Sequence, residues 1–386
     1  PPPATMVPGM PCKPCSASFD CVDCGAGCNC LNAPPRSPLW QVPFSARGDD
    51  GWKASSQPLC VGLQSITGHA IWADRRGVFT AVSGTSFGPS AVEVPDDDAG
   101  VVAENVVAGD FAARTRVFHN EGTGWSLRAD LIGSREVGLT AASAAKLIIY
   151  GDLGDQSEAC ALGVLSGAKL ECEKVLAVRA GFAVNETRAF ALAGAGIVLE
   201  SDGQSWISRS GPMTGARAIW ADDDDLVVVG LGGLVQRMVD DAWVSENVGS
   251  EAALTAVWGR NGDDLWVGDA AGRVLHFDGT SWQEIAQLGG VTCSRMTPIA
   301  HISGAGAHVW IHTSLQLARW DGSELESFGN WSCAPLRPDQ NFDTLQIEDI
   351  SAVSEDDVFI ALSDSAGASC GDVYAVHYDG SEFHRF

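Results

Sequence analysis

The sequence predicts an all-β protein, a seven-bladed β-propeller of four-stranded blades preceded by a small disulfide-rich N-terminal segment. Three observations predict this fold class. A phrase of about 40 residues returns in tandem along the chain. Each copy alternates apolar with polar or small residues in short runs that turn residues close, and tryptophans recur at fixed places. We expect residues 1–35 to form the Cys-rich segment with its linker, and residues 36–386 to form the propeller.

The most complete copy of the phrase is AVWGRNGDDLWVGDAAGRVLHFDGTSWQEI. Its predicted strands are Thr255 to Trp258, Leu265 to Gly268, Arg273 to Phe277 and Ser281 to Ile285. Asp278-Gly279 joins the third and fourth strands, because this pair tolerates the positive φ angles of a tight hairpin. Other copies carry a similar pair at the same place: Asp202-Gly203, Asp321-Gly322, Asp379-Gly380 and, in an earlier copy, Glu121-Gly122.

A four-stranded unit of about 40 residues cannot bury both faces of its sheet alone, so the copies are expected to stack radially. Seven predicted fourth strands lie near Trp125, Cys172, Trp206, Trp243, Trp282, Leu325 and Phe383. An eighth blade follows if residues 51–55 form another fourth strand. The first blade is long enough to hold an insertion, which we place in the acidic stretch Asp96 to Asp98.

The tryptophans are expected to fill the gaps between blades. Trp206, Trp243 and Trp282 open the fourth strand in three copies, and Trp220 and Trp258 close the first strand. Inter-blade packing is the usual role of buried aromatics, so it is favoured over an aromatic platform for a ligand.

The pattern xxVWGxxxDDLWVGDxxGxVLHFDGTSW resembles the propeller repeat of secreted proteins in large-genome bacteria, notably myxobacteria. The resemblance covers roughly residues 60–386. It implies the propeller fold and an extracytoplasmic setting, and it carries over no catalytic residue.

Charge composition bears on partners and location. Lysine and arginine total 24 against 49 acidic residues, a net charge of −25 that repels nucleic acid and anionic lipid and favours cations or basic surfaces. No run of 18 apolar residues is present, so no direct membrane insertion is predicted. The chain opens with three prolines and its first methionine is Met6, which indicates a mature exported protein, secreted or held in the periplasm or at the cell surface.

The 12 cysteines are all disulfide candidates. Six of them crowd the N-terminal segment: Cys12, Cys15, Cys21, Cys24, Cys28 and Cys30. Two C-x-x-C pairs would favour zinc or an iron-sulfur cluster in a cytosolic chain, whereas three local disulfides are favoured in an exported one. In the propeller we expect Cys160 with Cys172, Cys293 with Cys333 and, by elimination, Cys60 with Cys370, which would tie the first blade to the last.

Acidic residues cluster in turns, and loop carboxylates are ligands for calcium. Asp222, Asp223 and Asp224 are therefore weak calcium candidates, and apart from possible calcium no cofactor is predicted. These residues occupy the repeat's turn between first and second strands, where Asp side chains bond backbone N–H groups, so a structural turn is favoured.

The sequence offers little catalytic machinery, and no enzyme is predicted. Residues 84–88 match G-x-S-x-G, but a nucleophile elbow needs a strand-to-helix turn that an all-β chain lacks. His308 and His312 share one face of a predicted strand, with His301 the nearest further histidine. For this pair, an ordinary structural place on the strand is favoured over a metal site.

Two functions remain open. The first is a non-enzymatic binding or assembly module whose loops contact a protein partner or neighbouring subunit, with the Cys-rich head used for docking or anchoring. The alternative is a propeller that binds or hydrolyses carbohydrate through groups around its central channel.

Overall fold

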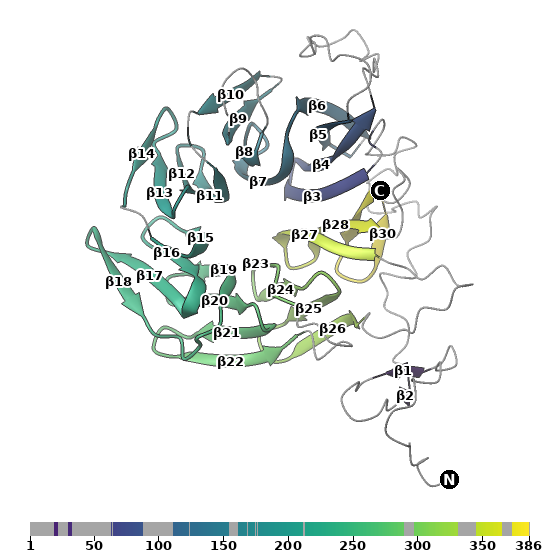
Figure 1. Cartoon of the computed structure of the whole chain (residues 1–386). Helices are drawn as coiled ribbons and strands as arrows, with labels where there is room; N and C mark the ends of the chain where they lie inside the picture. Colours follow the sequence, from purple (N-terminus) through teal and green to yellow (C-terminus); the bar gives the residue numbers. More distant parts are fainter. Residues whose placement is uncertain are drawn as a thin grey trace.

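The computed structural model describes residues 19–21, 30–32, 63, 65–87, 111–122, 124–153, 161–167, 169–173, 175, 177–210, 213–288, 297–330, 345–364 and 373–385. Within them, seven four-stranded antiparallel sheets radiate from a common centre (Figure 1). This arrangement confirms the predicted seven-bladed propeller. Among the described residues, no helix is both long and apolar enough to cross a lipid bilayer.

Each described blade is built from four consecutive strands, with the first strand innermost. Blades 1 to 3 comprise β3 (Ser65–Asp74), β4 (Gly77–Phe87), β5 (Phe111–Asn120), β6 (Trp125–Ile132); β7 (Arg135–Ser143), β8 (Lys146–Asp152), β9 (Leu162–Ser166), β10 (Lys169–Glu173); β11 (Val178–Asn185), β12 (Arg188–Ala193), β13 (Ile197–Ser201), β14 (Trp206–Ser208). Blades 4 and 5 comprise β15 (Ala216–Ala221), β16 (Leu226–Gly230), β17 (Leu234–Val239), β18 (Ala242–Glu246); β19 (Leu254–Asn261), β20 (Asp264–Asp269), β21 (Arg273–Phe277), β22 (Trp282–Gln287). Blades 6 and 7 comprise β23 (His301–Ala305), β24 (His308–His312), β25 (Gln316–Trp320), β26 (Leu325–Asn330); β27 (Leu345–Ser354), β28 (Asp357–Asp364), β29 (Val373–Tyr378), β30 (Phe383–Arg385).

All seven predicted fourth-strand positions fall on the fourth strand of a blade. A short 3-10 turn, η2 (Leu231–Gly233), connects β16 to β17. In the N-terminal segment, β1 (Phe19–Cys21) pairs with β2 (Cys30–Asn32) and places Cys21 opposite Cys30. The predicted boundary between residues 35 and 36, the acidic stretch Asp96 to Asp98 and the segment 51–55 lie outside the described residues.

The Asp-Gly pairs form the outer hairpins as predicted. In blade 5, Asp278 Oδ1 accepts hydrogen bonds from the amides of Thr280 at 3.0 Å and Ser281 at 2.8 Å, and Gly279 has φ of 86°. The Thr280 hydroxyl and these amides lower the pKa of Asp278 to about 2. Glycine is required because a side chain is strained at this φ.

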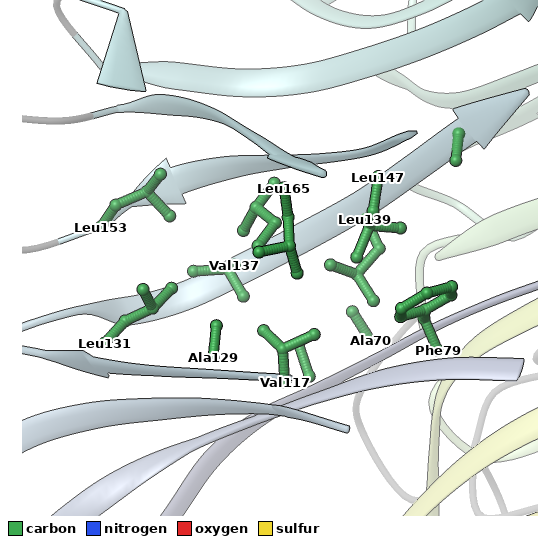
Figure 2. Packing of buried hydrophobic residues seen from close by; sticks show 13 residues of the cluster. Ala70, Phe79, Val117, Ala129, Leu131, Val137, Leu139, Leu147, Leu153 and Leu165 are labelled. Atoms are coloured by element: carbon green, nitrogen blue, oxygen red, sulfur yellow. The ribbon is translucent and has the colours of Figure 1, made fainter. Parts of the chain in front are cut away.

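The hydrophobic core is a ring of clusters, each lying between two neighbouring blades. Between blades 1 and 2, Ala70, Phe79 and Val117 face Val137 and Leu139 of β7 (Figure 2). The largest fully buried side chains are likewise placed between blades: Trp220, Trp266 and Trp310. Of the predicted set, Trp220 belongs to such a cluster, and Trp206, Trp243, Trp258 and Trp282 pack against one, which confirms the predicted inter-blade role.

One position near the end of each innermost strand joins neighbouring blades in two ways. In four blades it holds an aromatic residue: Trp72, Phe182, Trp220 and Trp258. In the other three it holds a hydroxyl that accepts a backbone N–H of the next blade: Thr140 from Ala183 at 3.1 Å, Ser303 from Ala352 at 3.0 Å and Ser351 from Ala73 at 3.0 Å. The last of these bonds closes the ring from blade 7 to blade 1.

Candidate binding site in the central channel

The innermost strands β3, β7, β11, β15, β19, β23 and β27 surround a central cavity of about 1810 Å³. Figure 1 shows these strands around the centre of the disc. The wall is mostly backbone and small side chains, among them Gly138, Ala180, Ala218 and Ala256. The few charged and polar groups on this wall therefore determine what the channel can recognise.

In blades 3, 4, 5 and 7 a β-bulge at the start of the innermost strand directs one side chain toward the channel. The register shifts lie between Val178 and Ala180, Ala216 and Ala218, Leu254 and Ala256, and Ile347 and Asp349. The extra residues are Arg179, Arg217, Thr255 and Glu348, and all four line the cavity. A bulge turns a side chain out of the regular alternation of a strand, which accounts for a ring of polar residues at one mouth of the channel.

The two arginines of this ring lie side by side on blades 3 and 4. Together with Thr255 they line a second cavity of about 400 Å³ that adjoins the channel. Arg179 Nη2 donates to the Gly194 carbonyl at 3.0 Å, and neither guanidinium forms an ion pair with a described residue. Most other described arginines do have a carboxylate partner, as Arg237 has Glu246 at 2.6 Å. In a chain of net charge −25, this arginine pair is an available anion-binding group.

Blade 7 contributes the acidic side of the ring. Glu348 accepts a hydrogen bond from the Ser363 hydroxyl, and Asp349 follows it on β27. Asp349 Oδ2 accepts the amide of Ile71 in blade 1 at 3.0 Å, and its Oδ1 accepts the amide of Ile350 at 2.9 Å. The channel mouth is therefore positive on blades 3 and 4 and negative on blade 7.

Two histidines of blade 6 lie beside Asp349. His301 on β23 is the direct cross-strand partner of His312 on β24, and its Nδ1 lies 2.5 Å from Asp349 Oδ1. Partial removal from water opposes charge on both members of the His301–Asp349 pair, but their mutual attraction raises the pKa of His301 and lowers that of Asp349. Burial and the neighbouring His301 lower the pKa of His312 to about 4, so this imidazole is neutral near pH 7.

Spacing along the sequence did not identify this trio. Both His308 and His312 lie on β24, but His308 Nδ1 contacts the Glu355 carbonyl at 3.1 Å at the other end of the strand. His301 joins His312 only through antiparallel pairing. The repeat does mark two of these residues as unusual. His301 in blade 6 and Asp349 in blade 7 occupy the position that Ala218 and Ala256 occupy in blades 4 and 5.

The weak calcium candidates lie in the turn between β15 and β16. Asp222 Oδ1 accepts the amides of Asp224 at 2.9 Å and Asp225 at 2.6 Å, so it is engaged in a side-chain-capped turn. Asp223 accepts a side-chain hydrogen bond from Asn185 at 3.4 Å and, through its carbonyl, one from Arg188 at 2.5 Å. Within the described part of the chain, the group of potential metal ligands is His301, His312 and Asp349, and it includes none of these three aspartates.

Most cysteine predictions lie outside the described residues. This holds for Cys12, Cys15, Cys24, Cys28, Cys60, Cys160, Cys293, Cys333 and Cys370. Cys172 on β10 is disulfide-bonded, and its expected partner Cys160 is not among the described residues. The individual pairings, including Cys60 with Cys370, stay predictions.

The G-x-S-x-G match begins within a regular strand. Gly84, Thr85 and Ser86 belong to β4, where they pair with Arg114, Ala113 and Ala112 of β5. A nucleophile elbow would require a strand-to-helix turn at the serine, so the match has no such geometry.

Comparisons with known proteins identify the fold. No protein-family model matches the chain, and no curated protein sequence matches it. Among solved structures, "YCF48 bound to D1 peptide" is 13% identical with a TM-score of 0.52, covering 87% of this chain and 99% of that one. YCF48 from Cyanidioschyzon merolae is 11% identical, with a TM-score of 0.51 and coverage of 83% and 98%. The WD40 repeats of RRP9 are 12% identical, with a TM-score of 0.53 and coverage of 80% and 91%. At these identities the similarity shows the propeller fold alone.

Proposed function

We propose that this protein is a non-enzymatic protein-interaction module that binds an extended, carboxylate-bearing segment of a partner at the channel mouth. The observation that carries the proposal is the pair Arg179 and Arg217, which bulges direct to one cavity and which no described carboxylate neutralises. Guanidinium groups suit carboxylates because they offer paired N–H donors in a planar fork. Propellers of the YCF48 and WD40 kind commonly serve as protein-interaction scaffolds, and one structural neighbour was solved with a bound peptide.

The proposal extends to the setting of the protein. The 12 cysteines and the resemblance of the repeat support action outside the cytoplasm, with the N-terminal Cys-rich segment docking to a neighbouring subunit or a cell-surface partner. Alkylation of the native, unreduced chain followed by intact-mass measurement tests the redox state. We expect none of the 12 cysteines to react before reduction. Ready alkylation of the native cysteines would argue against the exported setting.

The binding site is tested by fluorescence anisotropy with a labelled peptide of alternating Gly and Glu, and with the same peptide carrying Gln in place of Glu. The full chain should bind the Glu peptide, and binding should weaken as salt is raised. Replacing Arg179 and Arg217 together by Ala should weaken it at least about tenfold, since two charge-assisted contacts are lost.

Arg75 and Arg76 provide the matched control for that experiment. They are two exposed arginines in the turn between β3 and β4, and neither lines the channel. Replacing both by Ala removes the same total charge, so binding should remain within about twofold of the parent. Equal binding of the Gln peptide, or equal losses in the two double variants, would contradict the assignment.

Carbohydrate recognition is the second candidate. Trp72, Phe182 and Trp258 line the cavity and are only partly buried, so their rings offer apolar faces of the kind that sugar rings stack on. A glycan array probed with the full chain distinguishes the two functions. Binding abolished by Trp258→Ala but retained in the Arg179 and Arg217 double variant would favour carbohydrate.

A further inference from the structure

His312 has a buried ring nitrogen with no hydrogen-bond partner among the described residues. Its side chain is fully buried, and Nδ1 lies 3.1 Å from the Thr313 carbonyl. A carbonyl can only accept, so Nδ1 carries the proton and Nε2 presents a lone pair. This Nε2 is buried and unsatisfied within the described structure. A polar atom in that state costs free energy unless it meets a donor or an ion.

His312 also belongs to a group of side chains that can ligate a metal. One ligand atom each from His301, His312 and Asp349 lies within 4.8 Å of the others. Asp349 is held in place by the amides of Ile71 and Ile350, whereas the His301 side chain is 44% exposed to the channel and free to adjust. Two side chains of the trio are therefore fixed, and the third can turn.

The trio replaces small residues that the other copies of the repeat use at the same place. Ala180, Ala218 and Ala256 occupy the position of His301 and Asp349 in blades 3 to 5, and Gly268 stands opposite Ala256 where His312 stands opposite His301. In blades 3 to 5 the channel wall is thus packed without a polar side chain at this pair of positions. Packing alone therefore does not explain why two histidines and an aspartate stand together here in place of small or apolar residues.

We infer that His301, His312 and Asp349 form a binding site for a divalent first-row transition-metal ion, with Zn²⁺ the best match. Two imidazoles and one carboxylate are a familiar set of catalytic-type zinc ligands, whereas Ca²⁺ and Mg²⁺ need more oxygen atoms. The hydrogen bond between His301 and Asp349 gives way as the His301 ring turns toward the ion. The three ligand atoms then lie roughly 3.3 Å from one another, as ordinary zinc bond lengths require.

The groups around the trio would orient the ligands. The Thr313 carbonyl holds the tautomer of His312, and the two backbone amides fix the Asp349 carboxylate. The channel lies on the exposed side of His301, so the remaining coordination positions would face it and take water or a ligand carboxylate. This site is independent of peptide binding at Arg179 and Arg217, since it stands on different residues.

Zinc binding is measured on the full chain after chelator treatment, by titration against a chromophoric zinc indicator. At indicator concentrations the parent should bind one more equivalent of Zn²⁺ than His301→Gln or Asp349→Asn. The affinity of each variant for that equivalent should be at least about 100-fold lower than that of the parent. Zinc should also raise the Tm of the parent and leave that of His301→Gln unchanged. His384→Gln is the matched control, because His384 pairs with Asp379 at 2.8 Å and the described structure groups no third ligand with them.

Two readouts keep the test decisive. Because the N-terminal cysteines can bind zinc when reduced, Co²⁺ spectra are compared, and thiolate charge-transfer bands common to all variants are assigned to cysteine. His301→Gln changes a half-exposed side chain, so its circular dichroism should match the parent even if Asp349→Asn fails to fold. Equal zinc stoichiometry and affinity in the parent and folded His301→Gln would overturn the inference.

Discussion

Histidines on the third strand of two blades belong to a recurring structural unit. In blade 5, His276 stacks on Trp266 with ring centroids 4.3 Å apart, and Asp264 bonds both His276 at 2.9 Å and the indole N–H at 3.0 Å. In blade 7, His377 stacks on Phe359 at 4.6 Å and bonds Asp357 at 2.7 Å. Each of these His–Asp pairs links the second and third strands of its blade, so it stabilises the sheet rather than offering a site.

Removal of one such histidine should weaken the blade. We expect His276→Ala to lower the free energy of unfolding by about 1–2 kcal/mol, because it removes a stacked ring and a hydrogen bond to a charged group. Urea denaturation measures the change. The control is Gln283→Ala, which changes an exposed residue directly opposite His276 on β22 and should leave the free energy of unfolding within about 0.5 kcal/mol of the parent. An equal loss of stability in both variants would show that the stacked His276 contributes no more than an exposed residue.

Some features of single residues follow from the sequence, and others do not. The Asp278-Gly279 turn and the Trp set were predictable, because turn chemistry and aromatic spacing are local. The His301, His312 and Asp349 trio was not, because it depends on the pairing register of one hairpin and on the contact between blades 6 and 7. Neither relation is encoded in spacing along the chain. Comparing each copy position by position would have singled out the two substituted alanines.

Strands of neighbouring blades meet through either an aromatic ring or a hydroxyl at one repeat position. An aromatic such as Trp220 buries a large apolar area, whereas Ser351 supplies an acceptor for the buried amide of Ala73. The two kinds of residue stabilise the contact between blades differently. The aromatic ring contributes through many apolar contacts, whereas the hydroxyl satisfies a single buried N–H group.

The hydroxyl solution is sensitive to a small change. Ser351→Ala should destabilise the protein by about 1–3 kcal/mol, because the Ala73 amide then remains buried without an acceptor. Chemical denaturation of the two proteins measures the difference. Ser208→Ala removes an exposed hydroxyl from β14 and serves as the reference; if both variants lose the same stability, the bond between blades contributes nothing beyond the substitution itself.

Element boundaries followed the sequence closely where turns are glycine-marked and less well at the inner strands. The sequence predicted Thr255 to Trp258 for a strand that runs over Leu254–Asn261. The extra length comes from bulges at both ends, which let the strand continue past a register shift. Bulges depend on the partner strand, so alternation within one segment does not predict them, and the ring of Arg179, Arg217, Thr255 and Glu348 was missed for that reason.

The ring as a whole closes where blade 7 meets blade 1, and a buried histidine lies at that contact. His69 Nδ1 donates to the Leu362 carbonyl at 3.2 Å, and its Nε2 lies 2.5 Å from the Thr80 hydroxyl. The carbonyl can only accept, so Nδ1 carries a proton. Burial lowers the pKa of His69 from 6.5 to about 4.

Acid should therefore loosen the closure. Between pH 6.5 and 4 the unfolded chain takes up a proton at His69 that the folded chain does not, so stability falls as pH decreases through this window. The loss is at most on the order of 3 kcal/mol for this group. Equilibrium unfolding at several pH values should show a shallower decline for His69→Gln than for the parent. Parallel curves would mean that other groups set the acid response.

Self-contained blades have one further consequence. Each described sheet uses four consecutive strands, and the contact between β27 and β3 is made by side-chain hydrogen bonds and apolar packing. No described strand is shared between two blades. The order in which the blades follow one another along the chain should therefore not affect how each blade folds. We expect circular permutants opened in the segment 247–253, between blades 4 and 5, to form the same seven-bladed propeller.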